Sequence, residues 1–344
     1  MGRSEPLSRP HDESAFAALV EPHRRELQVH CYRMLGSFED SEDLVQETLL
    51  RAWRSRASFR FGDRSSFRAW LYRIATNACL DVLRRTPPRV MPPQLVPPGD
   101  PAAEPQPPAD LPWLQPYPDR LLEPVAPAEH EPGAVVVARE TMEIAFLVAI
   151  QRLPPRQRAV LVLRNVLGWS ANDTAALLEA SVAAVNSALQ RARATLRAHL
   201  PKRRTDWVPS SGPTDEEREL LRRYVDAHER ADVEALAELL REDALLTMPP
   251  HPTWYLGRDA IAVASEKGFH PEFGRLQSII AGANLQPAAA HYLRRPGETE
   301  YRPLALDVLR VDGGLIAEIH SFAMTLSPIF VVEGERPSRI KEIQ

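Results

Sequence analysis

From about residue 13 to residue 85, large apolar residues recur at intervals of three and four positions, with few glycines or prolines between them. This spacing places the apolar side chains on one face of a helix, whereas a strand alternates at every second position. The same helical spacing returns from about residue 136 to residue 200. The pattern therefore predicts two all-α blocks.

The last third of the chain has a different pattern. Helical spacing near residues 216–230, 232–241 and 258–267 is followed by alternating apolar and polar positions. "LALDVLRV" and "LIAEIHSFAM" flank the sequence Asp312-Gly313-Gly314, and two alternating runs around such a turn are typical of a β-hairpin. We therefore predict an α+β domain here.

A proline-rich segment separates the two all-α blocks, because 16 of the 33 prolines fall between Pro87 and Pro132. We expect five parts in the chain: an all-α domain at 13–86, a linker at 87–135, a second all-α domain at 136–203, the α+β domain at 214–330 and a tail at 331–344.

The linker contains a cluster of large apolar residues within "PWLQPYPDRLLEP". Exposing them gains nothing, whereas burial stabilises by roughly 25 cal/mol per Å². The cluster therefore indicates a docking segment, and we expect the C-terminal domain to receive it, with packing on the second α block as the alternative. The docking residues would be Trp113, Leu114, Tyr117 and Leu121.

Composition limits the function classes. The 344 residues are 44% hydrophobic and 26% charged, which is ordinary for a globular protein. The N-terminus lacks a signal-peptide core and no apolar run reaches bilayer length, so a cytoplasmic location without membrane contact is expected. Two cysteines and ten scattered histidines without paired spacing indicate no disulfide framework, metal site or cofactor.

Charge is unevenly distributed although the net charge is only −4. Residues 156–204 contain nine lysines and arginines but only two acidic residues. Residues 100–143 contain nine acidic residues but only two arginines. A basic block in a mildly acidic chain favours nucleic-acid binding. The second α block is therefore the candidate DNA-binding module.

Two neighbouring segments of the first α block carry candidate chemistry. In "DSEDLVQETLLRAWR", Val45, Leu49, Ala52 and Trp53 form an apolar stripe, and a second face carries Asp43, Gln46, Glu47 and Leu50. In "FRAWLYRIATNACLDVLRR", aromatic residues alternate with polar and basic ones. That mixture suits single-stranded nucleic acid, since rings stack on bases and guanidinium groups hold phosphates.

Together these two segments resemble regions 2.2 to 2.4 of the sigma-70 family of RNA polymerase initiation factors, specifically its extracytoplasmic-function group. The resemblance implies that the first helix binds the polymerase clamp through Asp43, Gln46, Glu47 and Leu50. It also implies that the second segment and the loop before it melt and read the −10 promoter element, through Phe61, Arg64, Trp70, Asn77, Asp81, Arg84 and Arg85.

The second α block has the pattern of a helix-turn-helix. Pro155 suits a first helical turn, Ser170 with Asp173 suits a capping box, and Ser181 suits the N-cap of a recognition helix. Such a helix enters the major groove. The block resembles region 4 of the same family, which contacts the polymerase flap and reads the −35 element; the DNA-binding residues would be Ser181, Asn186, Ser187, Gln190, Arg191 and Arg193.

The last third resembles the SnoaL-like branch of the cone-shaped NTF2-like fold. Some factors of this group, including the actinobacterial sigma J and sigma G types, carry such a domain, and the linker motif is similar to theirs. Relatives of the fold hold small molecules in a pocket, so a ligand is an open question here. The candidate pocket residues are Trp254, Tyr255, His291, Asp307 and His320.

We therefore predict a sigma factor, not an enzyme, that binds core RNA polymerase and promoter DNA and is modulated by its own C-terminal domain. Two alternatives stay open. One is a helix-turn-helix regulator that acts without polymerase, although this leaves the acidic helix unexplained. The other is a SnoaL-like enzyme or sensor fused to DNA-binding domains, which would require paired acid-base groups in the pocket.

Overall fold

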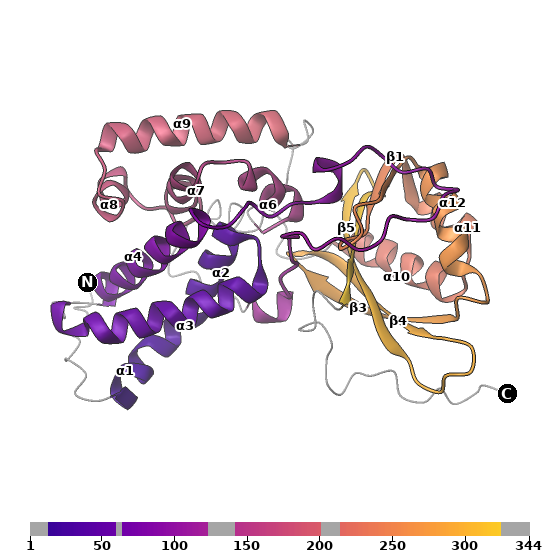
Figure 1. Ribbon diagram of the computed structural model, residues 1–344, viewed down its shortest axis with the longest axis horizontal. Helices are drawn as coiled ribbons and strands as arrows, with labels where there is room; N and C mark the ends of the chain where they lie inside the picture. The colour runs from indigo at the N-terminus through magenta and orange to yellow at the C-terminus, as the bar shows by residue number, and fades with distance from the viewer. Residues whose placement is uncertain (1–12, 60–63, 123–141, 201–213, 325–344) are drawn as a thin grey trace. The chain divides into compact units, whose positions relative to one another are not determined.

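The computed structural model describes residues 13–59, 64–122, 142–200 and 214–324. The chain divides into two compact units, each built from two stretches of sequence (Figure 1). Unit 1 comprises Met1–Arg89 and Leu121–Pro209, and unit 2 comprises Val90–Arg120 and Ser210–Gln344. Much of the proline-rich linker thus belongs to the same unit as the C-terminal third. Within the described ranges, no helix is long and apolar enough to cross a bilayer.

The first half of unit 1 is helical, as predicted, with α1 (Glu13–Val20), α2 (Arg24–Leu35), α3 (Phe38–Ser55) and α4 (Arg64–Leu83), and with short 3₁₀ turns at Glu21–His23 and Arg56–Ser58. Gly36 ends α2 with φ 71°, a left-handed conformation that glycine adopts at little cost. Ser37 then caps α3, because its hydroxyl accepts a hydrogen bond from the Asp40 N–H. The predicted stripe of α3 packs inward, with Val45 and Ala52 buried.

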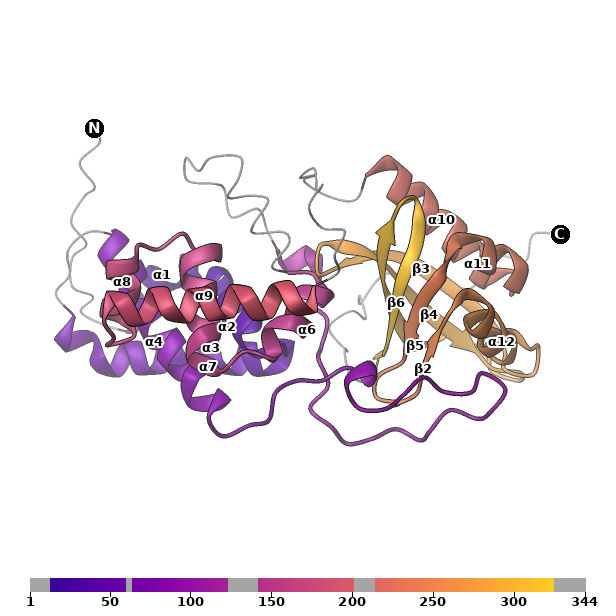
Figure 2. The same ribbon diagram turned by 90° about the horizontal axis from the view of Figure 1, so that it is seen from above.

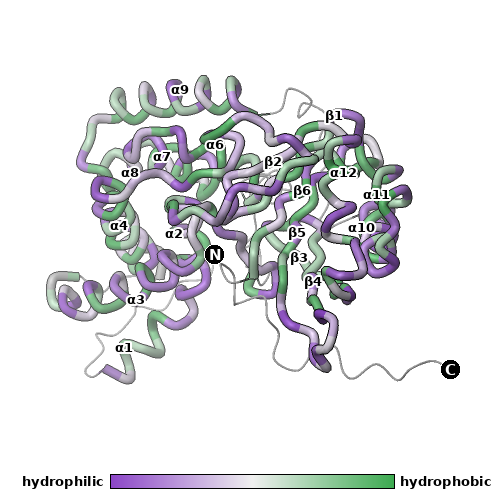
Figure 3. Tube along the Cα trace, turned by 45° about the vertical axis from the view of Figure 1, so that its right-hand side comes forward, coloured by the Kyte–Doolittle hydropathy of each residue, from purple (hydrophilic) through white to green (hydrophobic). Residues whose placement is uncertain are grey.

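The second half of unit 1 contains α6 (Ile144–Gln151), α7 (Pro155–Leu161), a π-helical turn (Val162–Val166), α8 (Ala171–Leu177) and α9 (Val182–His199). The predicted helix starts are confirmed: Pro155 opens α7, and the hydroxyls of Ser170 and Ser181 accept hydrogen bonds from backbone N–H groups in the first turns of α8 and α9. Polar and apolar stretches alternate along α9 (Figure 3). The helix-turn-helix is thus defined by its own local signals.

One hydrophobic core joins the two halves of unit 1, since buried side chains of α2, α3 and α4 belong to the same cluster as those of α6 to α9. Arg158 of α7 is buried in it and reaches across to α2. Its Nη1 donates hydrogen bonds to the Met34 carbonyl at 2.6 Å and to Gln151 Oε1 at 2.9 Å, and its Nη2 donates to the Gln151 carbonyl at 3.0 Å. Burial lowers the pKa of Arg158 to about 10, so the guanidinium stays charged at neutral pH.

In unit 2, three helices accompany a six-stranded sheet with the order β2-β1-β6-β5-β4-β3 (Figure 2). The helices are α10 (Asp215–Glu229), α11 (Val233–Leu239) and α12 (Arg258–Phe269). The strands are β1 (Leu240–Thr247), β2 (Trp254–Leu256), β3 (Arg275–Ala283), β4 (Gln286–Arg294), β5 (Arg302–Asp312) and β6 (Leu315–Ala323). β1 runs parallel to β6, and every other neighbouring pair is antiparallel. The predicted α+β architecture is confirmed.

The predicted hairpin forms as β5 and β6. Gly313 and Gly314 make its two-residue turn with φ of 63° and 78°, the left-handed values that this turn requires at both positions. One boundary differs from the expectation: helical spacing suggested a helix up to residue 241, but α11 ends at Leu239 and β1 begins at Leu240. Pairing of Leu240 with Ile316 of β6 overrides the local helical preference.

Candidate functional site

The predicted polymerase-binding face lies on α3 and is accessible. Asp43 and Gln46 are exposed, Glu47 is half-buried, and Leu50 leaves 50% of its surface in contact with solvent. The opposite side of the helix packs into the core, so this face is held in a fixed orientation by the rest of unit 1. An exposed leucine among acidic groups suits a partner that offers an apolar pocket with basic surroundings.

Ion pairs connect this face to the predicted promoter-reading helix α4. Arg51 Nε lies 2.7 Å from Glu47 Oε1, and Arg51 Nη1 lies 3.4 Å from Asp81 Oδ2. Asp81 also pairs with Arg84, the first residue after α4. All four side chains are partly exposed, so each pair is worth little in stability, but together they orient the two surfaces.

The residues predicted to read the −10 element divide into exposed and packed groups. Asn77 is exposed on α4, and Arg84 and Arg85 are exposed in the turn that follows α4, whereas the Trp70 ring stacks on Phe59 with centroids 4.7 Å apart. Trp70 is therefore part of an aromatic cluster in this conformation. Phe61 and the side chain of Arg64 lie outside the described residues.

The predicted −35 residues share one exposed surface of the recognition helix. Asn186, Ser187, Gln190, Arg191 and Arg193 are all exposed on α9, while Ser181 acts as its N-cap. Arg193 Nη2 donates to Asn165 Oδ1 at 2.8 Å. The turn before α9 also touches α4, because Arg73 Nη2 lies 3.1 Å from Glu179 Oε1.

The apolar linker residues pack within unit 2. Trp113, Leu114 and Tyr117 are buried, and Leu121 is partly buried at the unit boundary. The Tyr117 N–H donates to Asn284 Oδ1 at 2.8 Å, and the Asn284 N–H donates to the Tyr117 carbonyl at 2.9 Å. This reciprocal pair lies at the turn between β3 and β4.

Further linker contacts extend the docked region. Asp119 Oδ1 accepts a hydrogen bond from the Leu285 N–H at 2.8 Å, and the Trp254 indole donates to the Val96 carbonyl at 2.8 Å. Lys267 at the end of α12 contacts the carbonyls of Ala102 and Ala103. The linker therefore follows β2, α12 and the β3–β4 turn of the C-terminal domain.

The candidate pocket residues do not gather in one place. Trp254 packs against the linker, and Tyr255 belongs to the core beneath the helices. His320 pairs in register with Val308, one position from Asp307, so Asp307 and His320 point to opposite faces of the sheet. His320 contacts Thr247 and Glu318 there, each at 3.0 Å. Burial raises the pKa of Glu318, but hydrogen bonds and charge from His320 and Arg310 lower it to about 2.

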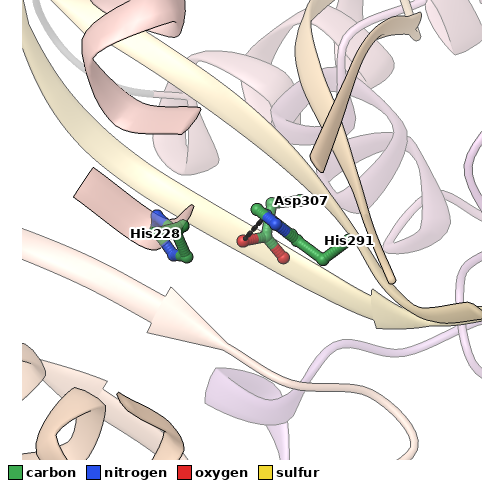
Figure 4. Close-up of side chains that lie close together, drawn as sticks. All are labelled: His228, His291 and Asp307. Atoms are coloured by element: carbon green, nitrogen blue, oxygen red, sulfur yellow. Dashed lines mark ion pairs between the residues drawn. The ribbon is translucent and has the colours of Figure 1, made fainter. Parts of the chain in front are cut away.

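Asp307 and His291, in contrast, lie together with a residue that sequence reasoning missed, His228 (Figure 4). His291 Nε2 is 3.0 Å from Asp307 Oδ2, and the Tyr224 hydroxyl donates to the same oxygen at 2.6 Å. Tyr224 and His228 are one turn apart on α10. The helical spacing that they share with the buried Leu221 is the one feature of the local sequence that could have indicated that they point toward the sheet.

The two ionisation states in this cluster follow from its surroundings. Burial works to raise the pKa of Asp307, but the neighbouring imidazole of His291 holds that pKa well below its usual range. Burial and the nearby His291 lower the pKa of His228 to about 4. At neutral pH the cluster therefore contains a carboxylate beside an uncharged His228 ring.

Three family models match the chain: "Sigma-70 region 2" at residues 19–87, "Sigma-70, region 4" at residues 143–196 and "SnoaL-like domain" at residues 221–319. They match the first half of unit 1, its second half, and the C-terminal part of unit 2.

Several curated relatives are named as ECF RNA polymerase sigma factors. The ECF RNA polymerase sigma factor SigG of Mycobacterium tuberculosis is 42% identical over 93% of this chain and 85% of its own length. The ECF RNA polymerase sigma factor SigM of the same species is 32% identical over 54% of this chain and 76% of its length. The crystal structure of the M. tuberculosis extracytoplasmic-function sigma factor SigJ superposes with a TM-score of 0.56, 22% identity, and coverage of 92% and 99%, which supports the fold.

Proposed function

This chain belongs to the extracytoplasmic-function sigma factors of RNA polymerase, and we propose that its C-terminal SnoaL-like domain controls promoter recognition by holding the linker between the two DNA-reading modules. Such factors act with core RNA polymerase and promoter DNA, so its place of action is the cytoplasm. One observation carries the proposal: linker residues Val90–Arg120 fold with the C-terminal domain and not with the helices that they connect.

Buried aromatic rings and backbone hydrogen bonds hold the linker within unit 2. Tyr117 and Trp113 bury large rings, and buried aromatic rings dominate the energetics of interfaces. The backbone of Tyr117 is fixed by two hydrogen bonds to Asn284. Releasing this segment would give the two reading modules a longer, freer tether and a lower effective concentration on promoter DNA.

The proposed binding surfaces are those described above: the acidic face of α3 for core polymerase, the exposed residues of α4 and of the turn after it for the −10 element, and the exposed face of α9 for the −35 element. A regulator that used only α8 and α9 would not need the acidic face of α3. We propose that the C-terminal domain has no catalytic role. Of the five candidate pocket residues only His291 and Asp307 lie together, and both are buried, whereas Trp254, Tyr255 and His320 lie in separate surroundings.

Removing the linker contact tests the proposed function. Asn284 has φ 58°, so Asn284→Gly keeps the backbone conformation and removes only the side chain that accepts from Tyr117. Combined with Tyr117→Ala, which costs roughly 3–5 kcal/mol of packing, it should undock the linker. We expect promoter-specific transcription with core polymerase to fall roughly tenfold through the lower effective concentration, with core affinity unchanged.

The matched control is Tyr301→Ala. Tyr301 is a partly buried tyrosine of the same domain whose ring faces Arg294 at 5.2 Å. Hydrogen exchange at the β3–β4 turn reports whether the linker has left its docking position. Normal transcription by a Tyr117→Ala/Asn284→Gly variant whose linker is undocked would contradict the proposed control.

Salt dependence tests the DNA-binding face of α9. If Arg191 and Arg193 hold phosphates, replacing either with alanine removes about one released counterion, so the slope of log affinity against log salt should fall by about 0.9 and all −35 sequences should weaken alike. Gln190→Ala should instead change which sequence is preferred. Binding assays over a series of salt concentrations measure both effects, and an unchanged slope for both arginine variants would move the DNA contact to another surface.

A further inference from the structure

Three potential metal ligands converge from three elements of unit 2. His228 comes from α10, His291 from β4 and Asp307 from β5, and one ligand atom of each lies within 4.8 Å of the others (Figure 4). His291 is 3% exposed and Asp307 is 5% exposed. The ligand types are thus two imidazole nitrogens and one carboxylate oxygen in an interior position.

Each side chain is oriented by a second contact that leaves a ligand atom available. His228 Nδ1 donates to the Tyr224 carbonyl at 2.9 Å, so the lone pair of the neutral ring is on Nε2. His291 Nδ1 lies 2.8 Å from Ser278 Oγ. The Tyr224 hydroxyl occupies Oδ2 of Asp307 and leaves Oδ1. Metal-binding histidines are typically held by this kind of contact through their other nitrogen.

Two of the available atoms are buried without a hydrogen-bond partner. Neither His291 Nε2 nor Asp307 Oδ1 has a well-aligned hydrogen bond within the described part of the chain, although His291 Nε2 lies 3.0 Å from Asp307 Oδ2 and forms an ion pair with it when the ring is protonated. A bound metal ion would take the place of that proton. Buried polar atoms are satisfied in the great majority of proteins. A cation coordinated by both the nitrogen and the oxygen would satisfy both atoms.

We propose that His228, His291 and Asp307 bind a divalent first-row transition-metal ion of the zinc class. Imidazole and carboxylate ligands are shared by zinc, cobalt and iron(II) sites, whereas magnesium and calcium prefer oxygen ligands alone. Three protein ligands leave at least one position for water or a small molecule. This site is independent of the linker contacts and of the proposed transcriptional role.

Metal binding by the full chain tests the proposal. Protein stripped with a chelator is titrated with Co²⁺ and then Zn²⁺, and we expect one equivalent of Co²⁺ with visible d–d absorption that Zn²⁺ displaces. His228→Gln and Asp307→Asn should each weaken binding at least tenfold and abolish the metal-induced rise in melting temperature. His270→Gln is the matched control, because His270 is an exposed histidine of the same domain.

Several results would overturn the proposal. One is wild-type protein that takes up no stoichiometric metal, in which case His291 and Asp307 share a proton instead. Another is a folded His228→Gln or Asp307→Asn variant that binds as tightly as wild type, or a loss of binding in His270→Gln. Circular dichroism of each metal-free variant verifies folding, and the wild-type stoichiometry decides the question even if a variant fails to fold.

Discussion

Arg158→Ala is expected to destabilise unit 1 by roughly 3–5 kcal/mol, which is a large part of the stability of most domains. The guanidinium is buried and hydrogen-bonds the carbonyls of Met34 and Gln151 and the Gln151 side chain. Truncation removes these bonds to a charged donor, leaves buried acceptors without partners and opens a cavity. Denaturant unfolding, monitored by a signal from unit 1, measures the loss.

The matched control for this variant is Arg156→Ala. Arg156 lies two residues earlier on α7 but is exposed, so its replacement should change stability by about 0.5 kcal/mol or less. If Arg158→Ala were equally mild, the hydrogen bonds between α7 and α2 would not hold the two halves of unit 1 together.

Reversing Asp43 and Glu47 to lysine is expected to weaken binding to core polymerase at least a hundredfold, about 2.7 kcal/mol or more. Both side chains lie on the accessible face of α3 beside the exposed Leu50. Like charges placed against a basic partner surface cost several kcal/mol. The Glu47–Arg51 ion pair that the reversal breaks is partly exposed and contributes little to folding stability. Titration of labelled core polymerase measures the affinity.

A control variant reverses the charge of two acidic residues on another surface, so that the change in net charge is the same. Glu238→Lys with Glu266→Lys changes two exposed acidic residues of α11 and α12 and makes the same change in total charge. It should bind polymerase normally. Undiminished binding by a folded Asp43→Lys/Glu47→Lys variant would remove α3 from the polymerase interface.

Features encoded within a few residues could be predicted from the sequence. Ser181 caps α9 through an N–H three residues away, and Gly313 with Gly314 makes a hairpin turn whose φ values only the local residues determine. The family motifs are likewise continuous segments. Such features depend on local chemistry, which a single sequence contains.

Features that depend on pairing between distant segments could not be predicted. Whether Asp307 faces the helices or the other side of the sheet depends on strand register, and its approach to His228 joins positions 79 residues apart on β5 and α10. From the sequence, Arg158 counts as one of the basic residues of a DNA-binding block, but it is buried. Its burial follows from packing between two helical halves that are far apart in sequence.

Arg73 of α4 lies 3.1 Å from Glu179 in the turn before α9, so the helix proposed to read the −10 element contacts the helix-turn-helix proposed to read the −35 element. Elements named −10 and −35 are separated by roughly 25 base pairs, about 85 Å of duplex at about 3.4 Å per base pair. Helices α4 and α9, of 20 and 18 residues, are each only about 30 Å long at about 1.5 Å per residue. If α4 and α9 read these two elements as proposed, the core that they share must separate first. Apparent promoter affinity would fall in proportion to the population of the separated form, so a tenfold smaller population lowers that affinity tenfold. The free energy of packing in the unit 1 core would then be a cost that binding to polymerase has to offset.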